Sequence, residues 1–245
     1  MSEFWIVIGL ALLPAVANFG GGLAAEVVQV SDRALSLALH LAAGVVLAVV
    51  GLELMPEAMR ASAPWVPLLA FVVGGVVFIA LDRAIGFVHG RLGGKDDNQA
   101  SALSIFGGVS IDLFSDGVMI GTGTVVNPAL GLLLALGQMP ADAPEGFAAI
   151  ATLRNAGIAR RRRILLSAGF AIPILAGATL GFFALRHAPE ILTLSLLALT
   201  AGALVSVVVE EMVSEAHEGD TSQLGPIFLT AGFALFGAIS VYLGD

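Results

Sequence analysis

The sequence predicts an all-α integral membrane protein with eight transmembrane helices. Its 245 residues are 58% hydrophobic and only 12% charged, whereas a soluble domain is about 25% charged. At roughly 20 apolar residues for each crossing, a chain of this length holds about eight helices and little else. We therefore expect a single transmembrane domain over residues 1–245.

Eight apolar runs follow one another along the chain, and each is long enough for one crossing. Gly and Pro recur inside the runs, which a bilayer tolerates because neighbouring helices satisfy the freed backbone groups. The segment before the first run, MSEFW, contains no Lys or Arg, so we interpret that run as a mature helix and not as a signal peptide. The runs lie at about 4–24, 34–54, 65–88, 102–124, 128–152, 164–186, 190–213 and 225–243.

The basic residues predict which side of the membrane each connection faces. Most of the 11 Lys and Arg residues lie in connections that follow odd-numbered runs, including Arg33, Arg154 and the cluster at 160–163. Only Arg60 and Arg186 follow even-numbered runs. Because cytoplasmic connections are rich in Lys and Arg, we expect both termini outside, in a bacterial inner membrane. This position also accounts for the Arg cluster, so nucleic acid is not an expected partner.

Two stretches of the chain match each other at an offset of 158 residues. Residues 42–58, AAGVVLAVVGLELMPEA, face residues 200–216, TAGALVSVVVEEMVSEA, and Glu53 matches Glu211. The seventh run is five crossings after the second, so the second copy runs in the opposite direction. An inverted repeat suits alternating access around a site near the midplane. The predicted parts are repeat 1 (helices 1–3, about 1–90), a central helix pair (about 101–153) and repeat 2 (helices 6–8, about 164–245).

The fourth and fifth runs each carry two acids near their middle. Asp112 and Asp116 are four residues apart, and Asp142 and Glu145 are three apart, so each pair lies on one helix face. A carboxylate in the bilayer core costs at least about 2.5 kcal/mol, and neither run contains Lys or Arg to compensate it. A divalent cation is the simplest partner, because oxygen ligands at this spacing can converge on it.

Acids at the ends of the second and seventh runs predict a pathway on either side of that site. The second run ends in Glu53, and the seventh ends in Glu210, Glu211, Glu215 and His217. Because the two copies cross in opposite directions, these side chains are expected near opposite mouths. Acids at helix ends are often only solvated termini, and that alternative stays open.

Two short motifs in the central helices carry a family resemblance. DLFSDG at 112–117 and ADAPEG at 141–146 resemble the paired H-N-x-P-E-G motifs of the ZIP (Zrt-, Irt-like) family of divalent metal transporters. The similarity includes the second, sixth and seventh runs and covers most of the chain. It implies a 3+2+3 arrangement of eight helices, outside termini, and zinc, manganese or iron as the transported substrate, with no cofactor. The implied ligands between helices 4 and 5 are Asp112, Asp116, Asp142 and Glu145.

Three positions depart from the family pattern. Leu113 stands where the family usually has Asn, Ile172 stands where the sixth helix usually supplies Glu, and Ala141 replaces a frequent polar ligand. The remaining ligands are all carboxylates, and hard oxygen ligands suit manganese or iron(II) as well as zinc. We expect one site of broad selectivity for divalent cations, and transport toward the cytoplasm.

Two other functions stay open. A proton-coupled small-molecule carrier would also have inverted repeats and midplane acids, but its substrate contacts should be aromatic or basic, and Trp5, Trp65 and Tyr242 lie near run ends. A ZIP relative that binds metal without transporting it would fit the three departures. Enzyme activity is not expected, because the chain has no H-E-x-x-H motif. Expected partners are membrane lipid and divalent metal ions, and the sequence leaves a homodimer open.

Overall fold

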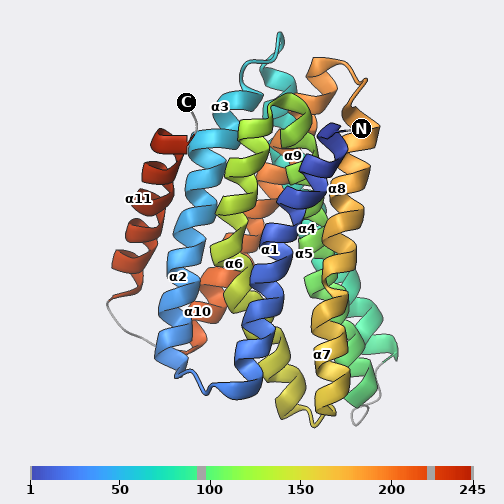
Figure 1. Ribbon diagram of the computed structural model, residues 1–245, viewed down its shortest axis with the longest axis vertical. Helices are drawn as coiled ribbons and strands as arrows, with labels where there is room; N and C mark the ends of the chain where they lie inside the picture. The colour runs from blue at the N-terminus through green and yellow to red at the C-terminus, as the bar shows by residue number, and fades with distance from the viewer. Residues whose placement is uncertain (1, 93–97, 220–223, 244–245) are drawn as a thin grey trace.

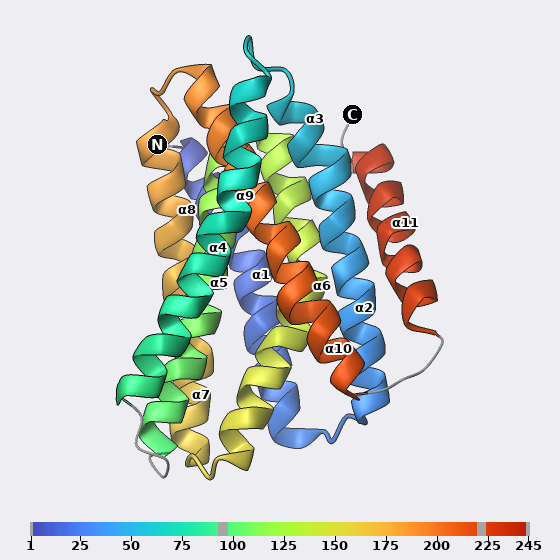
Figure 2. The same ribbon diagram turned by 180° about the vertical axis from the view of Figure 1, so that it is seen from behind.

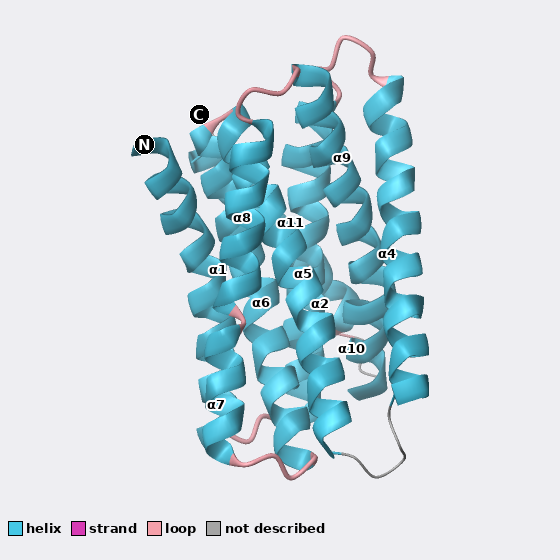
Figure 3. Cartoon of the chain, turned by 90° about the vertical axis from the view of Figure 1, so that its right-hand side faces the viewer, coloured by secondary structure: helices cyan, strands magenta, loops and turns pink. Residues whose placement is uncertain are grey.

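The computed structural model describes residues 2–92, 98–219 and 224–243. Within these ranges every regular element is a helix (Figure 3). Two of the elements, η1 and η2, are π-helical. In chain order the elements are α1 (Ser2–Val27), α2 (Asp32–Ala48), η1 (Val49–Leu54), α3 (Met55–Ala58), α4 (Trp65–Leu92), α5 (Asn98–Val126), α6 (Pro128–Asn155), α7 (Arg160–Gly169), α8 (Ala171–Leu185), α9 (Glu190–Val207), η2 (Val208–Met212), α10 (Val213–Gly219) and α11 (Gly225–Leu243).

In the described ranges these elements form eight rods that run lengthwise beside one another (Figures 1 and 2). α2, η1 and α3 are continuous, as are α9, η2 and α10, and only Phe170 separates α7 from α8. Six of the described rods are long and apolar enough to cross a membrane. Of the other two, α4 has a shorter apolar stretch, Trp65–Leu81, and α6 carries Asp142 and Glu145 in its middle. The prediction of an all-helical integral membrane protein is confirmed.

Glycines allow α2 and α11 to approach closely. A Cβ atom built on Gly44 of α2 would lie 1.9 Å from the carbonyl oxygen of Leu229 in α11. A Cβ atom on Gly232 of α11 would lie 2.0 Å from the carbonyl oxygen of Leu41. Distances this short leave no room for any side chain, so the two helices pack backbone against backbone.

The contact between α9 and α4 repeats this arrangement. A Cβ atom on Gly202 of α9 would lie 1.8 Å from the carbonyl oxygen of Phe71, and one on Gly74 of α4 would lie 1.9 Å from that of Leu199. Each of these four residues is 158 positions away from its counterpart in the α2–α11 contact. The offset read from the sequence therefore also relates two helix contacts in space.

A second pair of glycine contacts joins α1 to α6 and α8 to α5. A Cβ atom on Gly146 of α6 would lie 2.1 Å from the carbonyl oxygen of Asn18 in α1. A Cβ atom on Gly117 of α5 would lie 2.0 Å from the carbonyl oxygen of Ile174 in α8. Gly117 and Gly146 each end one of the acidic motifs, so both motifs lie at equivalent helix crossings.

Apolar side chains fill the bundle toward the end that carries α3, called here the α3 end. Leu130, Leu133 and Leu134 of α6 pack with Met119 and Ile120 of α5 in one buried cluster. η1, α9 and α11 contribute further members of that cluster: Val49, Val50, Leu54, Leu197, Leu204, Val207 and Phe236. This packing leaves the α3 end closed around the bundle axis.

A buried ion pair secures the opposite end, called here the Arg163 end. Nε of Arg163 donates to Oε1 of Glu26 at 2.5 Å, and Nη2 donates to Oε2 at 2.7 Å. Only 10% of the Arg163 side chain and 4% of the Glu26 side chain are exposed. Arg163 also donates to the carbonyl oxygen of Ile158, and Arg154 donates to that of Ala25 at 2.6 Å. Arg163 therefore ties α7 to α1, in addition to contributing positive charge to the cluster.

Candidate metal-binding site

Two neighbouring helices, α5 and α6, carry the four acids that the sequence singled out. Asp112 and Asp116 lie one turn apart on α5, and Asp142 and Glu145 lie close together on α6. α5 contains no Lys or Arg, and the one basic residue of α6, Arg154, lies in its last turn. The middle of this helix pair is therefore acidic without a basic residue on either helix nearby.

Asp116 and Asp142 form a buried pair. Each has only 1% of its surface exposed, and their carboxyl groups lie within hydrogen-bonding reach of each other. Nε2 of Gln138, which is also 1% exposed, donates to Oδ1 of Asp116. Neither Oδ2 atom receives a hydrogen bond from any other group that the structure describes. Since a buried carboxyl oxygen without a donor is costly, the pair is arranged to accept a proton or a cation.

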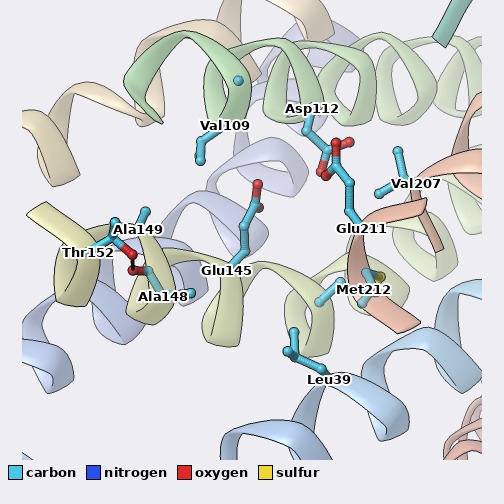
Figure 4. A pocket seen from close by; sticks show the side chains of 12 residues that line it. Leu39, Val109, Asp112, Glu145, Ala148, Ala149, Thr152, Val207, Glu211 and Met212 are labelled. Atoms are coloured by element: carbon cyan, nitrogen blue, oxygen red, sulfur yellow. Dashed lines mark hydrogen bonds between the residues drawn. The ribbon is translucent and has the colours of Figure 1, made fainter. Parts of the chain in front are cut away.

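A cavity of 280 Å³ lies between α5, α6 and η2 (Figure 4). Asp112 from α5, Glu145 from α6 and Glu211 from η2 line it, and the carboxylate of Asp112 points toward that of Glu211. The other lining residues are small or apolar, and among those described none is aromatic or basic: Leu39, Gly108, Val109, Ala141, Ala148, Ala149, Thr152, Val207 and Met212. The described lining is suited to a small cation and offers no aromatic or basic side chain to recognise an organic anion.

A second cavity lies beside this one, toward the Arg163 end. Ala148 and Thr152 line both, and the second cavity, of 390 Å³, also contacts Asp32, Arg154 and Asn155. Because Arg154 lies in the last turn of α6, the second cavity lies at the end of the bundle. The two residues that line both cavities, Ala148 and Thr152, have small side chains.

The predicted pathway residues lie in several different places. Glu53 accepts a hydrogen bond from Oγ of Ser240 and lines a separate cavity of 260 Å³ at the α3 end. Glu211 lines the central cavity, whereas Glu210 is exposed and does not line it. His217 is exposed, and its ring lies 5.2 Å from that of the buried His40. The side chain of Glu215 lies outside the described residues.

The three residues that depart from the family pattern lie in different surroundings in the structure. Leu113 is fully buried in an apolar cluster with Ile174 and Ala178. Ile172 is 71% exposed, and it does not line the cavity that Asp112 and Glu145 share. Ala141 does line the cavity, one turn before Glu145.

The four acids thus divide into a buried pair, Asp116 with Asp142, and a cavity pair, Asp112 with Glu145. Within the described residues no three His, Cys, Asp or Glu side chains lie close enough together to hold a metal ion. A cation bound by carboxylates alone therefore needs a closer arrangement than this one. Oxygen atoms of amides or water can complete the coordination of a hard cation in its place.

A comparison with known protein families finds a match that includes this pair of helices. A family model described as the ZIP zinc transporter matches residues 94–240, which include all of α5 and α6. The chain belongs to the ZIP zinc transporter family. The resemblance carried by DLFSDG and ADAPEG is confirmed, and both motifs lie inside the matched range.

ZIP relatives align with nearly the whole chain. The zinc transporter ZupT of Chlorobium phaeovibrioides (strain DSM 265 / 1930) is 29% identical over 99% of this chain and 99% of its own length. The zinc transporter ZupT of Enterobacter sp. (strain 638) is 26% identical over 96% of this chain and 95% of its own. That of Salmonella newport (strain SL254) is 25% identical over the same shares. The matches therefore include helices on both sides of the central pair.

Sequence reasoning missed two buried polar residues, Gln138, which donates to Asp116, and Asn18, which lies at the α1–α6 crossing. Both are buried, with 1% and 0% exposure. A signal existed for Gln138, because it lies four residues before Asp142 and so on the same face of α6. No comparable signal exists for Asn18, because only the helix contact of Gly146 places α1 next to this face.

Proposed function

We propose that the protein moves divalent metal cations across a bacterial inner membrane toward the cytoplasm, by alternating access through the carboxylates of α5 and α6. The observation that carries this proposal is the buried pair of Asp116 and Asp142, which forms no ion pair within the described residues. A dication balances two carboxylates without further charge, and buried charges need such compensation. Membership of the ZIP zinc transporter family supports the same conclusion.

The helix contacts support eight spans in a 3+2+3 arrangement. The contacts of Gly44 and Gly202 repeat at the offset of 158 residues, and η1 and η2 occupy matching positions at that offset. The matching crossings at Gly117 and Gly146 pair α5 with α6 as equivalents. We infer that residues 1–90 and 164–245 are inverted repeats around the central pair, as alternating access requires.

The distribution of charge supports outside termini. Arg154 and Arg163 lie at the Arg163 end, whereas Arg60 lies at the α3 end, where Figure 1 also places both chain termini. Because cytoplasmic ends are rich in basic residues, the Arg163 end is the cytoplasmic one in this proposal. The central cavity then opens inward, so the structure corresponds to an inward-open form.

The donor atoms support a broad choice of metal. Each of the four acids offers oxygen only, and the nearest polar residue, Gln138, is an amide. Oxygen donors accommodate manganese and iron(II) as readily as zinc. The relatives are named zinc transporters, which supports zinc as one substrate. We propose zinc, manganese and iron(II) as the substrate class, carried at one principal site.

Flux measurements in proteoliposomes test the proposal. Wild-type protein is expected to carry Zn²⁺ and Mn²⁺ into vesicles loaded with a metal-sensitive dye. Asp142→Ala combined with Glu145→Ala should abolish that flux. Glu190→Ala is the matched control, because this exposed acid lies in the first turn of α9, away from the cavity. Wild-type flux in the double variant would contradict the site assignment.

The same experiment separates the alternative functions. A relative that only binds metal would bind Zn²⁺ in detergent but carry none into vesicles, and buried Leu113 is the observation that favours it. The small-molecule carrier is disfavoured by a described cavity lining that has no aromatic or basic side chain. Membrane lipid is the proposed partner of the exposed apolar side chains of α4, such as Val72 and Val76. A homodimer stays a prediction.

A further inference from the structure

We propose that the side-chain amides of Gln138 and Asn18 complete an occluded cation site with Asp116 and Asp142. This site is separate from the open cavity that Asp112 and Glu145 line. The inference rests on the proposed function, because the ion that would occupy the site is the transported one. It adds two residues from outside the acidic motifs, one of them on α1.

Gln138 can donate a hydrogen bond to Asp116 and also offer an oxygen atom to a cation. It shares one face of α6 with Asp142 and Glu145, at spacings of four and seven residues. Its Nε2 atom donates to Oδ1 of Asp116, which holds that carboxyl in place. Its Oε1 atom is buried and has no hydrogen-bond partner within the described residues. A side chain anchored through its nitrogen in this way presents its carbonyl oxygen as a free ligand.

Asn18 approaches the same face of α6 from α1. It is fully buried, and neither Oδ1 nor Nδ2 has a partner in the described part of the protein. A Cβ atom built on Gly146 would lie 3.0 Å from Cγ of Asn18, and Gly146 lies one turn after Asp142. The amide of Asn18 is therefore at the α1–α6 crossing, beside the turn that carries Asp142.

The equivalent crossing on the other side of the central pair shows that packing alone does not require these polar groups. There, Ile174 of α8 meets Gly117 of α5 as Asn18 meets Gly146. Leu113 stands four residues before Gly117, as Asp142 stands four residues before Gly146. Apolar residues thus fill one crossing and an amide with a carboxyl fills the other. Burying unpartnered polar groups lowers stability, and a bound cation would offset that cost for the amides of Gln138 and Asn18.

The chemistry of the four side chains matches a hard divalent cation. Two carboxylates neutralise a charge of two, so the occupied site is neutral and tolerates burial. Amide oxygens raise the number of ligands without adding charge, and manganese and magnesium accept carboxylate and amide oxygens together. The same donors are poorer for zinc than nitrogen or sulfur would be. Gln138 and Asn18 are therefore expected to favour Mn²⁺ relative to Zn²⁺.

Mn²⁺ and Zn²⁺ flux into proteoliposomes, measured as the half-saturating concentration and the maximal rate, tests this inference. Gln138→Ala and Asn18→Ala should each raise the half-saturating Mn²⁺ concentration by about tenfold, which is the usual effect of removing a partner of metal-bound groups. Gln138→His replaces an oxygen donor by a nitrogen donor, so the ratio of the Zn²⁺ to the Mn²⁺ half-saturating concentration should fall about tenfold.

A structural role would give a different result, and Thr122→Val is the matched control. Thr122 is fully buried on α5, its Oγ1 atom also has no described partner, and it faces Gly181 of α8. The Mn²⁺-dependent rise in the unfolding temperature of the purified protein should shrink in Gln138→Ala and Asn18→Ala but not in Thr122→Val. The unfolding temperature without metal is subtracted for each variant, because Gln138→Ala also removes the donor to Oδ1 of Asp116.

The outcomes separate this inference from the proposed function. If Gln138→Ala and Asn18→Ala carry Mn²⁺ with the wild-type half-saturating concentration, the occluded site is excluded and metal transport stands. If wild-type protein carries neither Mn²⁺ nor Zn²⁺, the proposed function fails, and the inference fails with it.

Discussion

The two ends of the bundle contain matching π-helical segments in different surroundings. At the α3 end, η1 carries Glu53, which accepts a hydrogen bond from Ser240 and lines only a local cavity. At the other end, η2 carries Glu211, which lines the central cavity beside Asp112 and Glu145. π-Helical turns occur frequently at functional sites, and here both copies carry an acid at the matching position.

The difference between the two ends comes from the neighbouring side chains and not from the segments themselves. Near η1, Leu130 and Leu133 line the cavity that Glu53 also lines, and both belong to the apolar cluster that contains Met119 and Ile120. Near η2 the corresponding space is bordered by Ala148 and Thr152. The side chains that α6 contributes therefore differ in size between the two cavities, and Glu211, unlike Glu53, shares its cavity with Asp112 and Glu145. Variants at the two ends can test this comparison directly.

The largest expected effect concerns the ion pairs at the two ends. Arg163→Ala removes the bidentate partner of buried Glu26 and leaves the exposed Arg160 at 3.5 Å, so the unfolding free energy should fall by about 3 kcal/mol. Arg60 is 73% exposed and pairs with Glu57 at 3.0 Å. Arg60→Ala should therefore lower the unfolding free energy by at most about 1 kcal/mol. Thermal and denaturant unfolding in detergent measure both.

The double variant Arg163→Met with Glu26→Gln controls for the buried charge. It removes both charges together and should recover much of the stability lost in Arg163→Ala. Equal losses in the single and double variants would mean that packing, and not the unpaired carboxylate, causes the effect.

The next effect concerns how readily a water-soluble reagent reaches the Arg163 end and the apolar cluster toward the α3 end. The chain contains no cysteine, so single cysteines can be introduced without changing the background. Thr152→Cys should react with a membrane-impermeant thiol reagent from the Arg163 end, and Leu134→Cys, 0% exposed in the apolar cluster, should react at least about 100-fold more slowly because it requires local opening. Comparable rates would show that the α3 end is not closed.

A smaller effect is expected from the matching acids. Glu211→Gln should raise the half-saturating Zn²⁺ concentration for flux by about tenfold, because this carboxylate lies beside Asp112 in the cavity. Glu53→Gln should change it by less than about threefold, since its neighbour Ser240 still finds a hydrogen-bond acceptor in the amide. Dye-loaded proteoliposomes give both values, and an equal loss in the two variants would remove the distinction between the ends.

Much of the fold follows from hydrophobicity and internal repetition. Apolar runs predict the helices, and the match of Glu53 with Glu211 predicts an offset that also relates the contacts of Gly44 and Gly202. The π-helical turns were not predictable, since they depend on the helix contacts and not on a local pattern. The helices α4 and α5 are also longer than the apolar runs at 65–88 and 102–124, because polar residues extend them beyond the apolar core.

The candidate site was predictable only in part. Spacing placed Asp112 with Asp116 on one helix face, but the cavity reaches only the first of them, because Asp116 lies one turn further toward the packed end. The roles of Gln138 and Asn18 depend on how α1 crosses α6, which no single stretch of sequence encodes. Likewise, Arg163 resembled its exposed neighbours in the sequence but pairs with Glu26 in the fold.

Ala148 lies where the central cavity meets the cavity at the Arg163 end, and its side chain is a single methyl group. Thr152 is the other residue that lines both cavities, so these two positions border the region between them. A cysteine placed at Ala148 would be the only thiol in the molecule, so a bulky disulfide-forming reagent would fill this region and a reductant would empty it again. This residue offers a way to turn the protein off and on reversibly without altering any of its acids.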